Sequence, residues 1–409
     1  MSPDRLSTAY DPSRAEIIRD PFPAFAQLQD NDPAHWCAPL QGWVFTRYDD
    51  VLHVINDRSQ SADRLTPFFE HASGERNRFS DLARYLGHWM VFRDPPDHTR
   101  LRRLFNRVFT SSAVERLTPT IERIVSTLID EMENHLRLDE PIDLIADFAY
   151  PLPATIIMEM LGVPTNQLDQ VKQWSDDIAL FIGSAQASSN KYEQAQQGAQ
   201  AMGQLFSELV YSRTKTPRDD MITTMIQARD SDGTVSEEEI VSTCILLLFA
   251  GHETTTNLIG NGVFHALRSN TPWKRLCADP KLIATGVEEF LRYDGPIGAI
   301  SRIAKRPYQS YGKTIPEGAR VFAMINAANR DPRRFEQAHE MKVDRKDNQH
   351  ITFGYGIHFC LGAPLARLEG QIAVRELARR LPKMKLSTDV PQWTDSLVLR
   401  GIRSLPVYV

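Results

Sequence analysis

Apolar residues recur every three to four positions over most of the chain between about residues 97 and 292, which is the spacing of one buried face of an α-helix. The longest unbroken pattern starts at Ser236 and reaches about Arg268. Ser236 and Glu239 have the spacing of a capping box, in which two side chains close the first turn of a helix. A helix of roughly 30 residues is about 45 Å long. We therefore predict a helix that crosses the whole molecule.

Shorter patterns outside this region predict strands, for example at residues 43–46 and 320–325. Residues 57–90 are mostly polar and irregular, which predicts a long loop. No linker, repeat or low-complexity tract divides the chain. The sequence thus predicts a mainly α protein with a smaller β region, forming one domain over residues 1–409 with β-rich parts near 40–48, 296–325 and 386–409.

The composition narrows the class of protein. Of the 409 residues, 42% are hydrophobic, which is enough for a large buried core. The net charge of −5 implies no general affinity for nucleic acid or anionic lipid. The N-terminus has no signal segment and no apolar run is long enough to span a bilayer, so we expect no membrane anchor and a cytoplasmic location.

One cysteine, Cys360, lies in a glycine-rich segment at residues 353–362 that reads FGYGIHFCLG. Apolar residues then follow at helical spacing, which predicts a helix beginning just after the cysteine with Pro364 in its first turn. The N–H groups at a helix N-terminus favour a thiolate over a thiol. The neighbouring glycines would allow a flat, bulky group to approach the sulfur, as heme iron requires.

Other roles for Cys360 fit less well. A buried cysteine is usually a small hydrophobic residue, but that role does not need the surrounding glycines. A zinc site would need further ligands at short spacing, and Cys37, Cys244 and Cys277 are isolated. In a Cys–His hydrolase, His358 would be the base, but residues two apart are poorly placed to form such a pair.

The segment 353–362 resembles the cysteine-ligand loop of the cytochrome P450 family, F-G-x-G-x-H-x-C-x-G, at every defined position. The resemblance implies that Cys360 is the axial ligand of the iron of heme b (iron protoporphyrin IX), with Phe353, Gly354 and Gly362 also binding the heme. A thiolate in this place favours cleavage of the O–O bond. The implied fold has a long central helix over the heme and the cysteine loop on the proximal side.

Within the predicted long helix, the apolar residues before Ala250 give way abruptly to the polar segment Gly251-His252-Glu253-Thr254. This segment resembles the family's oxygen-binding motif, A-G-x-D/E-T-T. By that resemblance Ala250 and Gly251 leave room for dioxygen, Thr254 forms a hydrogen bond to the activated oxygen, and Glu253 helps to relay protons.

Two further motifs concern charge. Glu289 and Arg292 match the family's E-x-x-R pair, and with Arg345 they would form a structural network that holds the cysteine loop. His98 and Arg102 lie one helical turn apart. The resemblance assigns both to the heme propionates and adds two more groups, Arg302 and His358.

The resemblance implies a heme-thiolate monooxygenase that hydroxylates a lipophilic small molecule with one atom of O₂. Its electrons would come from NAD(P)H through a reductase and a ferredoxin or flavodoxin, which we expect to dock on the stripe Arg100, Arg103 and Arg107. A peroxide-driven heme peroxygenase and a non-catalytic heme sensor stay as alternatives, although neither needs Glu253 and Thr254. By analogy, the expected pocket residues are Leu246, Phe249, Ile297, Gly298, Ala299 and Leu397.

Overall fold

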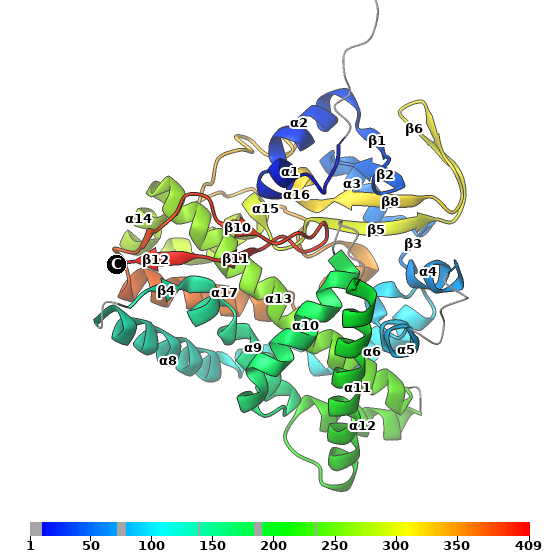
Figure 1. Ribbon diagram of the computed structural model, residues 1–409, viewed down its shortest axis with the longest axis horizontal. Helices are drawn as coiled ribbons and strands as arrows, with labels where there is room; N and C mark the ends of the chain where they lie inside the picture. Colours follow the sequence, from blue (N-terminus) through cyan, green and yellow to red (C-terminus); the bar gives the residue numbers. More distant parts are fainter. Residues whose placement is uncertain (1–9, 72–78, 138–139, 184–189, 234) are drawn as a thin grey trace, which may run out of the picture.

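The structure is a computed structural model that describes residues 10–71, 79–137, 140–183, 190–233 and 235–409 (Figure 1). Helices dominate it, as predicted. They are α1 Ala15–Arg19, α2 Phe22–Asn31, α3 Tyr48–Asn56, α4 Leu65–His71, α5 Ser80–Leu86, α6 Asp97–Val108, α7 Ser111–Glu115, α8 Thr118–Arg137, α9 Pro151–Leu161, α10 Leu168–Gly183, α11 Lys191–Lys215, α12 Met221–Asp232, α13 Glu237–Ser269, α14 Thr271–Ala278, α15 Ile283–Asp294, α16 Ile325–Ala328 and α17 Ala363–Arg380.

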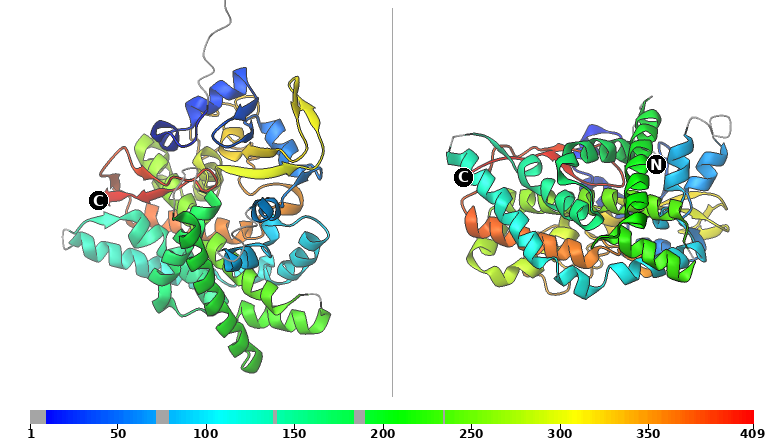
Figure 2. Two further views of the ribbon diagram at one scale, coloured as in Figure 1. Left: turned by 45° about the vertical axis from the view of Figure 1, so that its right-hand side comes forward. Right: turned by 90° about the horizontal axis from the view of Figure 1, so that it is seen from below.

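The long helix predicted from the sequence is α13, which has 33 residues. Its capping box is confirmed: the Glu239 N–H donates to Ser236 Oγ at 3.1 Å, and the Ser236 N–H donates to Glu239 Oε2 at 2.8 Å. Helices α9, α11, α15 and α17 all contact α13. It runs through the middle of the molecule in all three views (Figures 1 and 2).

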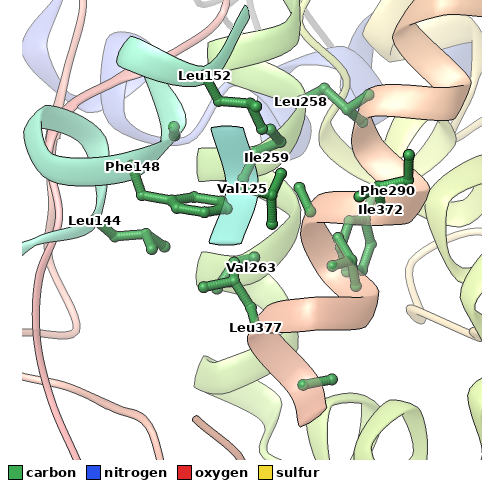
Figure 3. Packing of buried hydrophobic residues seen from close by; sticks show 14 of the residues in the cluster. Val125, Leu144, Phe148, Leu152, Leu258, Ile259, Val263, Phe290, Ile372 and Leu377 are labelled. Carbon is green, nitrogen blue, oxygen red and sulfur yellow. The ribbon is translucent and has the colours of Figure 1, made fainter. Parts of the chain in front are cut away.

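The largest apolar core lies where α13 meets α8, α9, α15 and α17 (Figure 3). Val125, Phe148, Ile259 and Leu377 are among its fully buried members. Burying one such side chain stabilises the fold by about 1.5–3 kcal/mol. This core fixes α17, and therefore the end of the cysteine loop, against the central helix.

The β region is small and divided: the largest sheet lies at the upper right of Figure 1, and strands β4 and β10–β12 lie on the left, near the C-terminus. A five-stranded sheet has the order β1-β2-β8-β5-β3, in which β2 and β8 are parallel and the other neighbours antiparallel. The strands are β1 Ala34–Cys37, β2 Gly42–Phe45, β3 Gln60–Ser61, β4 Ile142–Asp143, β5 Ala299–Ala304, β6 Tyr308–Ser310, β7 Lys313–Ile315, β8 Arg320–Met324, β9 Lys385–Leu386, β10 Gln392–Trp393, β11 Ile402–Ser404 and β12 Pro406–Tyr408.

The prediction of a long loop over residues 57–90 is wrong for the described residues of that stretch. They include β3, α4, α5 and the start of a 3₁₀ turn at Met90–Phe92. Leu82 and Leu86 of α5 are fully buried, and α5 contacts both α11 and α13. Packing from distant parts of the chain therefore decides this structure, not the local polarity. Within the described ranges, no helix combines the length and apolar character needed to cross a lipid bilayer.

Candidate active site

A cavity of about 340 Å³ lies between α13 and the cysteine loop. This volume is in the range of small-molecule sites, about 300–1,000 Å³. The lining includes most of the residues predicted for the site: Ala250, Gly251, Glu253, Thr254, His98, Arg102, Arg302, Phe353, Gly354, His358, Cys360 and Gly362. A second hollow of about 400 Å³ lies beside β3 and α6, and no predicted site residue lines it.

The cysteine loop has the backbone that its glycines predict. Gly354 and Gly356 have φ angles of 71° and 66°, in the left-handed region that other residues rarely adopt. The Cys360 N–H donates to the Phe353 carbonyl at 2.8 Å, which closes the loop. Helix α17 begins at Ala363 with Pro364 in its first turn, as predicted. The loop thus presents Cys360 to the cavity at the start of a helix.

The prediction that the helix end makes the Cys360 thiol acidic holds only in part. Burial raises the pKa of this thiol, and the backbone N–H groups of Gly362 and Ala363 and the charges of Arg102 and Arg367 offset only some of that effect. The accessible surface of Cys360 faces the cavity. A metal ion that binds such a sulfur removes its proton outright, so coordination would overcome the raised pKa.

On the part of the cavity lined by α13, the Thr254 hydroxyl donates to the Ala250 carbonyl of its own helix at 2.9 Å. Its oxygen lone pairs remain available to groups in the cavity. Gly251 has an additional role that its motif did not suggest. A Cβ at this position would lie 3.1 Å from the side chain of Ile157, so the glycine also lets α13 pack closely against α9.

Glu253 has two basic neighbours, His252 and Lys172. His252 is fully buried, and its Nδ1 lies 2.6 Å from the Leu248 carbonyl, which leaves Nε2 at 3.4 Å from Glu253 Oε1. Burial raises the pKa of the Glu253 carboxyl, but His252 and Lys172 stabilise the carboxylate, so the pKa is lowered. Glu253 is therefore ionised at neutral pH, with His252 as its nearest partner.

Basic groups gather on the cavity wall near Cys360. His98 is 2% exposed, and neither of its ring nitrogens has a hydrogen-bond partner. Burial lowers the pKa of His98 and, to about 3, that of His358, and nearby arginines lower both further. Burial also lowers the pKa of Arg302 to about 10. The two histidines are thus neutral at pH 7, while Arg102 and Arg302 carry positive charge.

These groups fit the two propionates of a heme. The nearest acid that acts on Arg302 is Asp94, which is already engaged by Lys305 at 2.8 Å and by the Ser61 hydroxyl at 2.7 Å. The unpartnered ring nitrogens of His98 and the two arginines therefore call for acceptors from outside the chain. Two carboxylates of a group bound beside Cys360 match this need.

The structure brings Glu289, Arg292 and Arg345 together, although they come from two distant segments. Arg345 Nε lies 3.0 Å from Glu289 Oε2, and the Lys342 N–H donates to Glu289 Oε1 at 2.7 Å. The carboxylate is completely buried. This arrangement joins α15 to the segment that leads into the cysteine loop.

The predicted pocket residues divide into two groups. Leu246, Phe249, Ile297 and Ala299 line the cavity. Gly298 and Leu397 do not line it, which corrects that part of the prediction. The Gly298 N–H donates to the Val398 carbonyl at 2.9 Å, and a Cβ on Gly298 would lie 2.5 Å from the Leu397 carbonyl oxygen, so these two backbones pack against each other. Val398 and Leu399 line the cavity in place of Leu397.

The predicted docking stripe is only partly free. Arg100 forms an ion pair of 2.5 Å with Glu239 at the start of α13. The same carboxylate accepts the capping hydrogen bond from the Ser236 N–H. Arg103 is exposed. The side chain of Arg107 lies outside the described residues.

One acidic residue of the cavity, Glu369 on α17, belongs to none of the motifs found in the sequence. It is 2% exposed, lines the cavity, and has one carboxylate oxygen without a hydrogen-bond partner. Burial raises its pKa to about 8, against a weaker opposite effect of Thr255. The sequence does contain an indication of its burial, because Glu369 falls on the apolar stripe of this helix between Leu365 and Ile372.

The cavity brings together a glycine-framed cysteine at a helix start, an acid–alcohol pair and a group of basic side chains, and this combination fits a heme bound through a thiolate. The sequence profile of the cytochrome P450 family matches residues 43–276 and 268–392. The chain belongs to the cytochrome P450 family, as its motifs predicted.

Bacterial relatives align with nearly the whole chain. The polyketide biosynthesis cytochrome P450 PksS of Bacillus subtilis is 35% identical over 97% of this chain and 98% of its own. The mycinamicin IV hydroxylase/epoxidase of Micromonospora griseorubida is 36% identical over 94% of both chains. A crystal structure of P450BioI in complex with hexadec-9Z-enoic acid ligated acyl carrier protein has a TM-score of 0.88 and 32% identity, covering 96% of this chain and 99% of that one.

These similarities confirm the predicted fold and the predicted class of enzyme. The protein is a cytochrome P450 monooxygenase, an oxidoreductase whose family uses a heme iron cofactor.

Proposed function

We propose that this protein binds heme b through Cys360 and hydroxylates a lipophilic small molecule. One atom of O₂ enters a C–H bond of the substrate, and the other leaves as water after the uptake of two electrons and two protons. The observation that carries the proposal is the cavity itself, which is lined both by Cys360 and by the Glu253–Thr254 pair. Similarity to bacterial hydroxylases supports it.

When bound, heme supplies the activation of dioxygen, which no amino-acid side chain can supply. Cys360 provides the thiolate ligand, and His98, Arg102, Arg302 and His358 bind the propionates. The Thr254 hydroxyl, which donates to the Ala250 carbonyl, accepts a hydrogen bond from a proton-bearing group in the cavity. By accepting this hydrogen bond, the Thr254 hydroxyl holds the proton-bearing group in the part of the cavity where water is to form.

Two carboxyl groups of the cavity exchange protons with the proton-bearing group that this hydroxyl holds. Glu253 is ionised and takes a proton from the direction of His252, whose Nε2 lies 3.4 Å from it. Glu369 is protonated at neutral pH, because burial raises its pKa to about 8. A carboxylate that receives protons and a carboxylic acid that holds one give the cavity two distinct proton sources.

The walls around the remaining space favour an apolar substrate. Leu246 and Phe249 of α13, Ile297 and Val398 contribute hydrocarbon surface. Trp89 stacks on Phe249 with ring centroids 5.6 Å apart, which makes this wall broad and rigid. Terpenoids, polyketides and fatty acyl chains all have the apolar surface that such a cavity buries.

We further propose that electrons arrive from NAD(P)H through a reductase and a ferredoxin or flavodoxin. The exposed Arg103 on α6 supports this, because acidic carriers bind basic surfaces. A cytoplasmic location stays a prediction.

The test is a comparison of two ways of driving the purified heme-bound protein with a lipophilic substrate. The first uses NAD(P)H with a surrogate ferredoxin and its reductase, and the second uses hydrogen peroxide alone. We expect hydroxylated product in the first and little in the second. Product with peroxide alone would support a peroxygenase, and no product in either, for any compound that shifts the spin state, would support a sensor.

The ferrous protein under carbon monoxide gives the control for ligation. A thiolate ligand produces a strongly red-shifted Soret band, and Cys360→His should abolish that shift while retaining heme. A wild-type spectrum without the shift would contradict the whole proposal.

A further inference from the structure

A fifth basic group, Arg64, lines the cavity and has no role in any motif of the sequence. It lies between β3 and α4, in the stretch predicted as a loop. Its guanidinium carbon is 4.2 Å from the centre of the Phe92 ring, so its flat face is covered by an aromatic side chain. In the part of the chain that the structure describes, no carboxylate forms a hydrogen bond or ion pair with Arg64.

An arginine in this situation needs an anion. Burial lowers the pKa of Arg64 to about 9, and repulsion from Arg302 and Arg320 acts in the same direction. The group is nevertheless charged at neutral pH, and a contact with an aromatic ring compensates only a small part of the lost hydration. Asp94, which partly balances Arg302, does not reach Arg64.

Arg64 belongs to the same electrostatic cluster as the groups assigned to the propionates. The charge of Arg302 acts on Arg64, His98 and His358 alike, so all three lie close to it. The wall on α13 is different, because Leu246 and Phe249 are apolar there. A carboxylate held between Arg64 and Arg302 would therefore lie in the part of the cavity assigned to the heme propionates, away from the apolar wall on α13.

We propose that Arg64 binds a heme propionate together with Arg302, and so ties the start of α4 to the cofactor. This deepens the proposed function and rests on it, since it assumes that heme occupies the cavity. The other residues assigned to the propionates include His98 and Arg102 on α6 and Arg302 on β5, so Arg64 would add a contact from the start of a further helix, α4. Phe68 of α4 contacts Phe181 of α10 and Tyr192 of α11, with ring centroids 5.4 and 5.8 Å away. Heme anchored by Arg64 would thus hold the helix that packs against α10 and α11.

The first measurement is the rate at which heme passes from the purified protein to excess apomyoglobin. We expect Arg64→Gln to lose heme at least about ten-fold faster than wild type, because a charge-assisted bond to a carboxylate is lost. Arg64→Lys keeps the charge and should stay within a few-fold. Arg58→Gln removes an exposed arginine nearby and should behave as wild type.

The second measurement is the midpoint potential of the heme iron. Removing a positive charge beside a propionate favours the ferric state, so Arg64→Gln should have a lower potential, with Arg64→Lys close to wild type. A purely structural arginine would not give this pattern. If Arg64→Gln fails to retain heme during purification, Arg64→Lys is measured instead. Heme loss from it should become faster at higher ionic strength if a charge at position 64 holds a propionate, and salt-independent loss would overturn the proposal.

Binding of a substrate carboxylate is the alternative source of the anion. Spin-state titrations with a long-chain fatty acid and its methyl ester distinguish it. If Arg64→Gln weakens binding of the acid only, and leaves heme transfer and potential unchanged, the proposal is overturned. The carbon-monoxide spectrum of every variant reports thiolate ligation separately, so a failure of heme ligation is not mistaken for a failure at Arg64.

Discussion

Arg292 donates two hydrogen bonds of 2.8 Å to the two carboxylate oxygens of Glu289, and neither side chain is exposed to solvent. The remaining donors of Arg292 reach the carbonyls of Asn329, Ala338 and Glu340 at 2.9–3.0 Å. Every strong donor of the guanidinium is therefore used. A charge pair this well satisfied joins α15 to the segment before the cysteine loop with a single geometry.

Replacing one partner should leave the other charge buried and unpaired. We expect Glu289→Gln to lower the free energy of unfolding by about 3–5 kcal/mol. Denaturation by urea, followed by tryptophan fluorescence and by the Soret band, measures the loss. The Soret band should disappear at a lower urea concentration than the fluorescence changes, because the cysteine loop loses its support first.

A matched control is Glu376→Gln on α17. Glu376 pairs with Arg379 at the same i, i+3 spacing, but the Arg379 side chain is 66% exposed. We expect a loss of no more than about 1 kcal/mol there. Equal losses at Glu289 and Glu376 would show that burial of the Glu289–Arg292 pair carries no special weight.

The hydroxyl of Thr254 gives a prediction on coupling. In Thr254→Ala, substrate binding and reduction should continue, but product formed per NAD(P)H should fall about ten-fold, with hydrogen peroxide in its place. The reason is the loss of the hydroxyl oxygen that holds a proton in the cavity. Product and peroxide, each measured against NAD(P)H consumed, test this.

Thr256→Ala is the control on the same helix. Thr256 is buried but does not line the cavity, so its loss should leave the coupling unchanged. Normal coupling in Thr254→Ala would remove Thr254 from the mechanism.

Most of the fold could be predicted from local signals. The capping box at Ser236 and the apolar run after it predict α13 almost to the residue, because both signals lie within the helix itself. The helix α5 was missed, since Leu82 and Leu86 are buried by α11 and α13, which are distant in sequence. Local polarity cannot report such contacts.

The candidate site shows the same division. Its motif residues could be found because they lie in short contiguous segments of the sequence. Gly298 and Leu397 were placed wrongly in the pocket, because the pairing of Gly298 with Val398 decides which side chains face inward. Arg64 carries no sequence signal, and its position in the cavity follows only from how α4 packs.

The exposed Arg103 gives a prediction on electron transfer. If an acidic carrier docks on α6, Arg103→Glu should slow reduction about ten-fold at low ionic strength. The two rates should converge at higher salt, since charges are screened over about 8 Å at 0.15 M. Stopped-flow reduction by a ferredoxin measures both. Arg403→Glu, an exposed charge reversal on β11, is the control, and rates insensitive to Arg103 and to salt would rule out docking here.

The buried acid Glu369 gives a prediction on pH. Its pKa is raised from 4.5 to about 8 in the folded protein, mainly by burial. Between these values the folded state holds a proton that the unfolded chain has released, so stability falls as pH rises, by up to about 1.4 kcal/mol per pH unit. Below about pH 4.5 both states are protonated and this loss is absent.

Glu369→Gln removes this titration while keeping the shape of the side chain. We therefore expect the variant to gain stability relative to wild type as the pH is raised from 5 to 8, in urea denaturation of the heme-bound protein. At the same time its coupling should fall and lose its dependence on pH over that range, since an amide cannot deliver a proton. Glu131→Gln on α8, at an exposed position, should change neither quantity. A stability difference between Glu369→Gln and wild type that is constant from pH 5 to 8 would mean that Glu369 is already ionised in the folded protein, and would exclude it as the proton-holding acid of this cavity.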